Sequence, residues 1–339
     1  MKKLLIFLSL VLFLSAPALA TKVALVFDAG GKFDKSFNQS AWEGAVRARD
    51  TIGITLKDVE PGDTSAIEEA FRVFAKEGYD LLVGIGFANA PSVEKVAKEF
   101  PNTNFAIVDM VVNLPNVASL VFKEQEGSFL VGMIAGMRSR VIDGQRTVGF
   151  IGGMDIPLIH KFEAGYTQGA KLVWPNIKVI ANYVGNTPTA WNDPAKGKEI
   201  ANSQISKGAS VIYAAAGASG NGMFDAVKET NPKGPCYPQK NRTDNCVYAI
   251  GVDSNQNYLI PGQVLTSMLK RVDVAVYDTI KAVDAGNFEG KITVFDLSNN
   301  GVGYALDEHN DRLVPKSIQK VVDQYRQKII AGEIVVKEK

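Results

Sequence analysis

The sequence predicts an α/β protein built from two similar lobes, each with a parallel sheet. Short apolar, β-branched runs alternate with stretches of helical periodicity, as in parallel sheets whose strands are joined by helices. The alternation starts again near residue 148, which indicates two βα series in succession rather than one large sheet. The chain has 339 residues, and the 319 that remain after a predicted 20-residue signal peptide (339 − 20) suit two lobes of about 150 residues each.

The first 20 residues are predicted to be a secretory signal peptide. Lys2 and Lys3 precede an apolar stretch at residues 4–14, and the small residues at 18–20 offer a cleavage site before Thr21. The alternative is a membrane anchor, but the stretch is shorter than the roughly 20 apolar residues that a spanning helix needs. No Cys lies near the cut to carry a lipid. We therefore expect a soluble mature protein in the periplasm.

The first βα series follows directly. Residues 23–27 are apolar throughout, as a buried parallel strand should be. Residues 65–76 have Ile67, Ala70, Phe71 and Phe74 on one helical face. The remaining elements expected in this lobe are strands at 54–56, 81–83, 105–108 and 117–121 and helices at 40–50 and 90–100.

The second series begins after a helix rich in small residues, predicted at 127–140. Its expected strands are 148–151, 178–182, 210–214 and 247–250, and its expected helices are 162–173, 194–207 and 221–229. The last part of the chain adds strands at 264–268, 292–295 and 302–305 and helices at 272–285 and 315–330. The pattern alone does not assign these last elements to a lobe.

Charge and cysteine content narrow the class of protein. The chain has 37 Lys and Arg against 36 Asp and Glu, and this balance argues against a nucleic-acid partner, which requires a basic face. The only cysteines, Cys236 and Cys246, lie close together in a polar stretch. In an exported protein such an even pair predicts a disulfide. A zinc site is the weaker alternative, because no His lies near.

Polar and aromatic residues recur where the predicted strands end. Ligands of open α/β sheets bind at the carboxyl ends of the strands. Carboxylates there accept hydrogen bonds from sugar hydroxyls, and aromatic faces stack on rings, so the set suits a planar ring bearing a polyol. Asp28 and Asp34 could instead cap the first helix, Asp193 could cap the helix that starts at Pro194, and Trp191 could be core. The candidates are Phe27, Asp28, Ser36, Phe37, Asn38, Asp109, Trp191, Gly217, Asp253 and Lys270.

The stretch at residues 28–44 resembles the opening of a known family. It reads Asp-x-Gly-x-x-x-Asp-x-Ser-Phe-Asn-Gln, followed by Ala-Trp-Glu-Gly at 41–44. This is similar to the basic membrane protein family, the solute-binding subunits of ABC importers that include the PnrA-like purine nucleoside receptors. The similarity continues through residues 83–87, 105–109, 126–132, 149–153, 192–197, 215–217 and 251–253.

The resemblance implies a type I periplasmic binding fold, in which two Rossmann-like lobes are joined by several crossing strands. After the signal peptide at 1–20, the expected N-terminal lobe is 21–124 plus about 269–290. The expected C-terminal lobe is 125–268 plus about 291–339.

The resemblance also implies roles for the site residues. Phe27 and Trp191 would sandwich a purine, with Trp191 departing from the Phe that is common in the family. Asn38 and Asp109 would bind the base, and Gly217, Asp253 and Lys270 would bind the ribose. Asp28, Ser36 and Phe37 would border the cleft. The stretch that contains Cys236 and Cys246 is not part of the family pattern.

Together these features predict a monomeric receptor that captures a purine nucleoside and delivers it to a membrane permease, without a cofactor or a metal. One alternative is another ring solute, such as a free purine base or a riboflavin-like compound. Another is an exported nucleoside hydrolase that uses clustered Asp residues. Against the hydrolase, His160 and His309 are the only histidines and fit no catalytic triad, and the sequence contains no phosphate loop or zinc signature.

Overall fold

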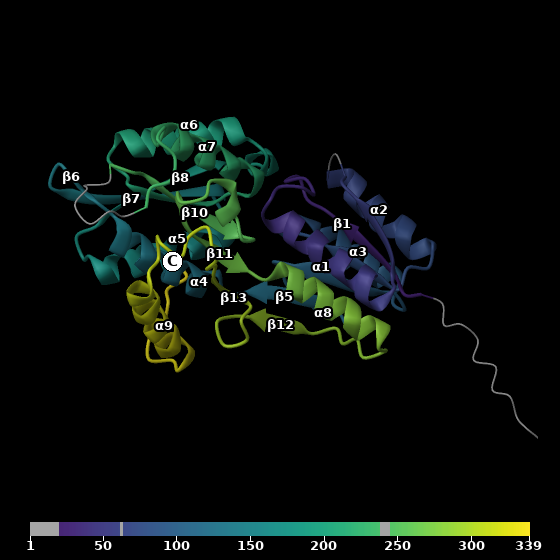
Figure 1. The fold of residues 1–339 in the computed structure, drawn as a ribbon. Coiled ribbons are helices and arrows are strands. Elements are labelled where there is room, and N and C mark those ends of the chain that lie inside the picture. The colour runs from purple at the N-terminus through teal and green to yellow at the C-terminus, as the bar shows by residue number, and fades with distance from the viewer. Residues whose placement is uncertain (1–19, 62–63, 238–244) are drawn as a thin grey trace, which may run out of the picture.

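The computed structural model describes residues 20–61, 64–237 and 245–339, and in these ranges the chain forms two α/β lobes (Figure 1). The predicted two-lobed α/β architecture is confirmed. The expected signal peptide lies, except for Ala20, outside the described residues. In the described ranges, no helix combines the length and the apolar character that a membrane span requires.

The N-terminal lobe contains a six-stranded, fully parallel sheet in the order β12-β5-β4-β3-β1-β2. Helices α1 and α8 cover one face of this sheet, and α2 and α3 cover the other. The strands are β1 (Lys22–Val26), β2 (Thr55–Val59), β3 (Leu81–Gly84), β4 (Asn104–Val108), β5 (Val117–Phe122) and β12 (Ile292–Phe295). The helices are α1 (Phe37–Ile52), α2 (Thr64–Lys76), α3 (Ala90–Glu99) and α8 (Val272–Asp284).

The C-terminal lobe has the strand order β8-β7-β9-β10-β11-β13, in which only β13 runs antiparallel, and a short β6 also pairs with β7. Helices α6 and α7 cover one face, and α4, α5 and α9 cover the other. The strands are β6 (Val141–Ile142), β7 (Gln145–Met154), β8 (Lys178–Gly185), β9 (Val211–Ala215), β10 (Tyr248–Asp253), β11 (Val264–Lys270) and β13 (Val302–Tyr304). The helices are α4 (Glu124–Arg138), α5 (Pro157–Val173), α6 (Pro194–Ser206), α7 (Asn221–Thr230) and α9 (Lys316–Ile330).

Strand β12 lies in a different lobe from the one expected. The expected boundary near residue 290 assigned it to the C-terminal lobe, whereas it pairs in parallel with β5 of the N-terminal lobe. The ring of Phe295 stacks on that of Phe122 with the centroids 4.9 Å apart, which fixes the strand on this sheet. The chain therefore returns to the C-terminal lobe only between Phe295 and Val302.

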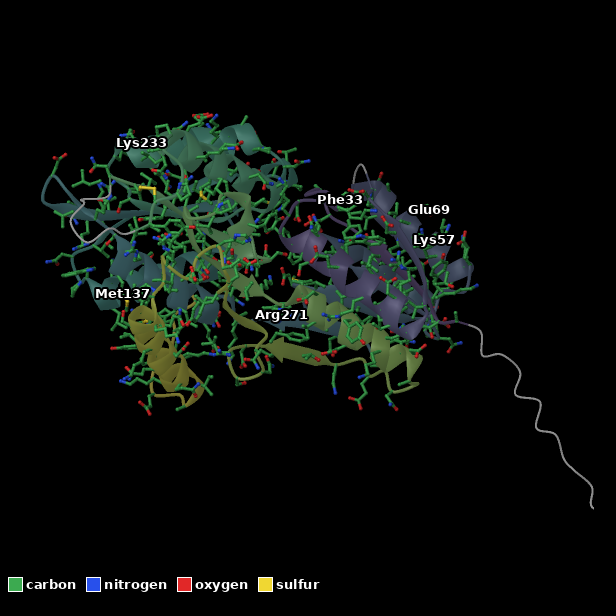
Figure 2. The ribbon with its side chains drawn as sticks, in the orientation of Figure 1. Phe33, Lys57, Glu69, Met137, Lys233 and Arg271 are labelled. Carbon is green, nitrogen blue, oxygen red and sulfur yellow. A yellow bond between two sulfur atoms is a disulfide. The ribbon has the colours of Figure 1, made fainter. Side chains whose placement is uncertain are left out.

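The lobes are joined by three crossing segments: between β5 and α4, between β11 and α8, and between β12 and β13. The segments are hydrogen-bonded to one another. The Lys123 ammonium lies 3.0 Å from Asp296, and the Arg271 amide donates to the Gly301 carbonyl at 2.9 Å. Arg271 lies between the two lobes in Figure 2. The crossing segments thus form one connected hinge.

A buried ammonium group occupies the centre of this hinge. Lys270, at the end of β11, is only 1% exposed. Its Nζ lies 2.6 Å from Asp109, which follows β4 in the other lobe, and 3.1 Å from Glu124, the first residue of α4. Burial would lower the pKa of Lys270, but the charges of Asp109 and Glu124 raise it, so the side chain stays protonated. One cation thereby joins three elements from both sides of the hinge.

Helix α4, which leaves the hinge, is packed on α5 at backbone contact distance. A Cβ added to Gly132 would lie 2.2 Å from the Tyr166 carbonyl oxygen, and one on Gly165 would lie 2.1 Å from that of Gln125. Only glycine permits so close an approach of the two backbones. At the hinge end of the C-terminal lobe, the two helices are therefore packed backbone to backbone.

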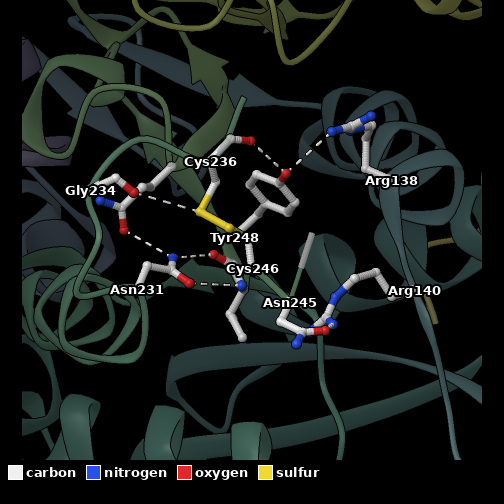
Figure 3. Close-up of a disulfide and its surroundings, with 10 residues drawn as sticks. Arg138, Arg140, Asn231, Gly234, Cys236, Asn245, Cys246 and Tyr248 are labelled. Carbon is white, nitrogen blue, oxygen red and sulfur yellow. Dashed lines mark hydrogen bonds between the residues drawn. A yellow bond between two sulfur atoms is a disulfide. The ribbon is translucent and has the colours of Figure 1, made fainter. Parts of the chain in front are cut away.

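The predicted disulfide between Cys236 and Cys246 is present (Figure 3). It lies at the start of β10, where the Tyr248 hydroxyl donates to the Cys236 carbonyl at 2.8 Å and accepts a hydrogen bond from Arg138 of α4 at 3.3 Å. Residues 238–244, between the two cysteines, are outside the described ranges. The bridge closes a short loop on the C-terminal lobe, at the amino end of β10 and thus at the opposite end of that strand from Asp253.

Replacing Lys270 by Met is expected to lower the free energy of unfolding by about 3–5 kcal/mol near pH 8, because it leaves Asp109 and Glu124 buried without their counter-ion. Burial already raises the pKa of Asp109 to about 7. The folded state therefore holds a proton that the unfolded carboxyl has released above pH ~4. Without the Lys270 charge the pKa of Asp109 should rise further, so the folded variant keeps a proton that the folded wild type loses above pH ~7. The loss of stability should therefore be larger at pH 8 than near pH ~5.5, where both folded proteins hold the proton.

Urea denaturation of both proteins at the two pH values measures this effect. Lys161→Met is the matched control, because Lys161 also contacts Glu124, at 3.4 Å, but its side chain is 27% exposed to water. It should cost no more than about 1 kcal/mol. Equal losses for the two variants, or a loss for Lys270→Met that does not change with pH, would contradict the assigned role of the buried ammonium.

Candidate ligand-binding site

A pocket lies between the lobes and is lined by residues of both. Residues that follow the carboxyl ends of strands in both lobes form much of its wall, as the sequence predicted. Eight of the ten candidate residues line it: Asp28, Phe37, Asn38, Asp109, Trp191, Gly217, Asp253 and Lys270. The other lining residues are Gly30, Asp34, Gly86, Phe87, Leu158, Ile159, Phe162, Ala215 and Val252.

The loop between β1 and α1 forms the N-terminal wall of the pocket. The Asp34 carboxylate accepts hydrogen bonds from the backbone N–H groups of Ser36, Asn38 and Gln39 at 2.8, 3.0 and 3.1 Å. Asp34 thus caps α1, as the sequence analysis gave as the alternative to a role in ligand binding. Burial raises the pKa of Asp34 to about 7 despite these hydrogen bonds. The cap fixes where Phe37 and Asn38 enter the pocket.

Asp28 and Asn38 are hydrogen-bonded to each other across this loop. The Asn38 amide nitrogen donates to the Asp28 carboxylate at 2.7 Å, and the Gly30 amide donates to the same oxygen at 2.9 Å. Burial raises the pKa of Asp28 above its ordinary value, and the two hydrogen bonds oppose the rise.

Asp109 and Asp253 occupy equivalent positions in the two lobes. Each stands at the carboxyl end of a strand, β4 or β10, with a left-handed backbone: φ is 68° at Asp109 and 62° at Asp253. Asp is one of the few residues other than glycine that adopt this conformation readily. Burial raises the pKa of Asp253, and the charge of Lys270 opposes the rise. The duplicated fold thus brings two carboxylates to one pocket from opposite sides.

The aromatic residues of the pocket are Phe37 and Phe87 from the N-terminal lobe and Phe162 and Trp191 from the C-terminal lobe. Trp191 ends the short 3₁₀ helix η2 (Pro188–Trp191), and its indole lies against Gly153 of β7. A Cβ added to Gly153 would lie 2.1 Å from the indole ring. Glycine at 153 therefore makes room for the large ring.

Phe27 is not brought to the pocket. It is fully buried and belongs, with Val23 and Leu25, to the core cluster that includes the buried alanines of α1. Successive side chains of a strand point to opposite faces, and position 27 falls on the α1 side. Phe27 thus belongs to the core, and the N-terminal lobe presents Phe37 and Phe87 to the pocket instead.

Ser36 contacts the opposite lobe rather than the pocket. Its hydroxyl donates to the Asp253 carboxylate at 2.5 Å, and its carbonyl accepts from the Ser254 hydroxyl at 3.0 Å. The neighbouring Lys35 carbonyl accepts from Gln256 at 2.9 Å. This turn, residues 34–36, therefore links the two lobes directly beside the pocket.

Several site residues could not be chosen from the sequence. Phe162, Leu158 and Ile159 lie on α5, where their apolar spacing looks the same as that of ordinary core residues. Glu124, the second carboxylate on Lys270, begins a helix whose buried residues gave no separate signal. Asp193 caps α6 by accepting from the Lys196 amide at 2.9 Å, so its interpretation as a helix cap is confirmed.

The arrangement is suited to binding rather than to bond cleavage. Lys270, the cation of the pocket wall, is engaged with Asp109 and Glu124, so the remaining polar groups are mainly hydrogen-bond acceptors. Neither histidine of the chain lines the pocket. In the described part of the chain, no group of three or more His, Cys, Asp or Glu side chains is arranged to hold a metal ion.

The comparisons with known proteins agree with this geometry. The family model described as ABC transporter substrate-binding protein PnrA-like matches residues 20–339. A CD4+ T-cell-stimulating antigen of Listeria monocytogenes is 37% identical, over 94% of this chain and 88% of that protein. The ABC transporter nucleoside-binding protein BmpA of Lactococcus lactis is 35% identical, over 94% of this chain and 89% of that protein. An uncharacterized lipoprotein of Pyrococcus horikoshii is 32% identical, over 93% and 84%.

Solved structures show the same architecture. A solute-binding protein of an ABC transporter system from Aeropyrum pernix superposes with a TM-score of 0.83 at 31% identity, covering 94% of both chains. An ABC transporter periplasmic solute-binding protein from Actinobacillus succinogenes shares the fold with a TM-score of 0.63 at 13% identity, covering 86% of this chain and 99% of that one. The fold is thus the type I periplasmic binding fold, and these relatives are solute-binding proteins, not enzymes. By sequence and by structure, the chain belongs to the PnrA-like family of ABC transporter substrate-binding proteins.

Proposed function

We propose that this protein binds a purine nucleoside between its lobes and delivers it to the permease of an ABC importer. The observation that carries the proposal is the combination of aromatic rings and strand-end carboxylates from both lobes in one pocket. Rings offer stacking faces to a base, and carboxylates accept hydrogen bonds from sugar hydroxyls. The name of the Lactococcus lactis relative, a nucleoside-binding protein, supports the same ligand class.

The proposed roles follow the pocket wall. Trp191 stacks on the base from the C-terminal lobe, and Phe37 and Phe87 contact it from the N-terminal lobe. Asn38 and Asp109 bind the edge of the base. The ribose is bound by Gly217, Asp253 and Lys270. Asp28 and Ser36 act through their neighbours, because they hold Asn38 and Asp253 in place.

Ligand capture then requires that the lobes close about the three-segment hinge. A ligand that contacts both lobes binds the closed state more tightly than the open one and so shifts the population toward closure. The pocket meets this condition, because its walls come from the N-terminal loops and from the β10 and η2 regions of the C-terminal lobe. The hydrogen bonds of residues 34–36 to the C-terminal lobe also contribute to the free energy of closure, and they do not involve the ligand.

We further propose that the protein acts as a soluble monomer in the periplasm after cleavage behind Ala20. Several Pyrococcus relatives are named lipoproteins. In this chain, however, both cysteines of the sequence are joined to each other in the C-terminal lobe, so neither is free to carry a lipid.

Isothermal titration calorimetry of protein stripped of any carried-over ligand should show one binding site for inosine, guanosine or adenosine. D-ribose is the control and should give no heat, because it has no ring for Trp191 to stack on. Prolonged incubation with inosine should release no ribose. Absence of heat with all three nucleosides would sink the nucleoside assignment, and repeated turnover would overturn the receptor role.

The Asp253→Ala variant tests whether the sugar is recognised. Its affinity for inosine should fall by about 1–3 kcal/mol more than its affinity for hypoxanthine, because only the nucleoside has hydroxyls to lose a buried acceptor. Ser36→Ala removes the hydrogen bond that holds Asp253, so it should weaken inosine more than hypoxanthine, but by less than Asp253→Ala does. Asp193→Ala, which uncaps α6 outside the pocket, should leave both affinities unchanged. Equal losses for base and nucleoside in Asp253→Ala would favour a free-base receptor.

A further inference from the structure

The indole of Trp191 lies directly against the backbone of β7. A Cβ added to Gly153 would lie 2.1 Å from Cζ3, 2.4 Å from Cε3 and 2.9 Å from Cη2 of the indole. All three atoms belong to its outer, six-membered ring. The pocket is lined by Trp191 but not by Gly153, which is buried. The ring therefore lies between the pocket and the strand, and the strand leaves it no room to move back.

One hydroxyl group fixes the main chain on both sides of Trp191. Ser219, in the 3₁₀ helix η3 (Gly217–Gly220), is fully buried. Its Oγ donates to the Ala190 carbonyl at 2.8 Å and accepts a hydrogen bond from the Asp193 amide at 2.7 Å. A hydroxyl can make both bonds at once. The chain is thereby tied to one point of the C-terminal lobe both before and after the tryptophan.

Ser219 is itself held by close packing of backbones. A Cβ added to Gly197 of α6 would lie 2.0 Å from the Ser219 carbonyl oxygen. A Cβ added to Gly222 of α7 would lie 1.9 Å from the Pro194 carbonyl oxygen. Only glycine lets backbones approach so closely. Helices α6 and α7 and the η3 turn are therefore in direct backbone contact, which fixes the position of the Ser219 hydroxyl.

These supports of Trp191 all lie within the C-terminal lobe. Gly217 of the same lobe is a further neighbour of the ring, since a Cβ added to it would lie 3.8 Å from Trp191 Cε3. Gly30 of the N-terminal lobe also comes near Trp191, but at the Cβ atom, which would lie 3.7 Å from a Cβ added to Gly30. The contacts of Trp191 with Gly153 and Ser219 would therefore remain if the lobes separated.

We propose that Gly153 and Ser219 are positioning residues that hold the Trp191 indole as a fixed stacking wall, formed within the C-terminal lobe before the lobes close. This inference rests on the proposed function, in which Trp191 stacks on the base of the ligand. A wall that is already ordered loses little conformational entropy when the ligand binds. The two positions are also coupled, because the indole needs a residue without a Cβ behind it.

The variants Gly153→Ala and Trp191→Phe, alone and combined, test the coupling by calorimetry with inosine. Gly153→Ala should lower the affinity by about tenfold or more, because the added methyl group pushes the indole into the pocket. Phenylalanine lacks the outer carbons of the indole, so adding Gly153→Ala to Trp191→Phe should cost no more than about threefold. Gly303→Ala in β13 is the matched control. A Cβ there meets no atom within 4 Å, so the affinity should not change.

Equal losses for Gly153→Ala in the two backgrounds would overturn the coupling. If Gly153→Ala alone does not fold, the double variant decides. An affinity close to that of Trp191→Phe supports the coupling, and an affinity lower by about tenfold or more contradicts it. Failure of the wild-type protein to bind any nucleoside would instead refute the proposed function.

The variant Ser219→Ala tests the fixation of the main chain. It removes both hydrogen bonds of the hydroxyl and should lower the affinity for inosine by about fivefold or more. Asp193→Ala is the matched control in the same segment, because it removes the cap of α6 but keeps the backbone amide that Ser219 binds. It should bind inosine as the wild type does. Equal affinities of the two variants would overturn the role of Ser219.

The ligand-free protein tests whether the wall exists before closure. The chain has three tryptophans, so Trp42→Phe combined with Trp174→Phe leaves Trp191 as the only one. The decay of its fluorescence anisotropy should show the same restricted motion of the ring with and without inosine, and wider motion once Ser219→Ala is added. Wide motion in the ligand-free protein that still carries Ser219 would overturn the preformed wall. This result does not depend on which solute the protein binds.

Discussion

One buried positive charge connects the two halves of this protein. The Lys270 ammonium is withdrawn from water, and it is stable there because a carboxylate from the other lobe and one from the start of α4 both approach it. Breaking such a cluster by removing one partner is far more costly than losing a surface ion pair. The end of β4, the start of α4 and the end of β11 are therefore held together. In the proposed closure, movement is expected in the segments around them.

The same cluster determines the character of the pocket. Because two carboxylates already pair with the cation, most of the polar groups of the pocket wall are carboxylate and amide oxygens, and aromatic faces lie beside them. Such a wall favours an uncharged, donor-rich solute and disfavours one that carries a phosphate, since like charges in a poorly hydrated pocket repel strongly. The two Asp residues with left-handed backbones show how a duplicated fold builds this wall. Each lobe contributes the side chain at the end of an equivalent strand, and both side chains line one pocket.

The sequence predicted most of the fold, because a buried parallel strand followed by an amphipathic helix leaves a clear pattern. The positions at strand ends followed from the same rule, and eight of ten candidates line the pocket. The prediction for Phe27 was wrong because side chains along a strand alternate between the two faces of the sheet. A resemblance to a family does not determine on which face a given side chain lies. Strand β12 was assigned to the wrong lobe because the sequence of a short edge strand does not show with which sheet it pairs. Phe162 and Glu124 were missed because pocket residues on a buried helix have the same periodicity as core residues.

The turn at residues 34–36 has a consequence for an importer as a whole. Its hydrogen bonds to Asp253, Ser254 and Gln256 are made by the protein alone, so part of the closing free energy does not depend on cargo. Without a ligand, a receptor with such direct contacts between its lobes reaches the closed form more readily than one whose lobes are joined only through the ligand. In the proposed import role, closed copies without ligand would compete with loaded ones for the permease. In that role, the strength of these hydrogen bonds would determine how many receptors close before a ligand arrives.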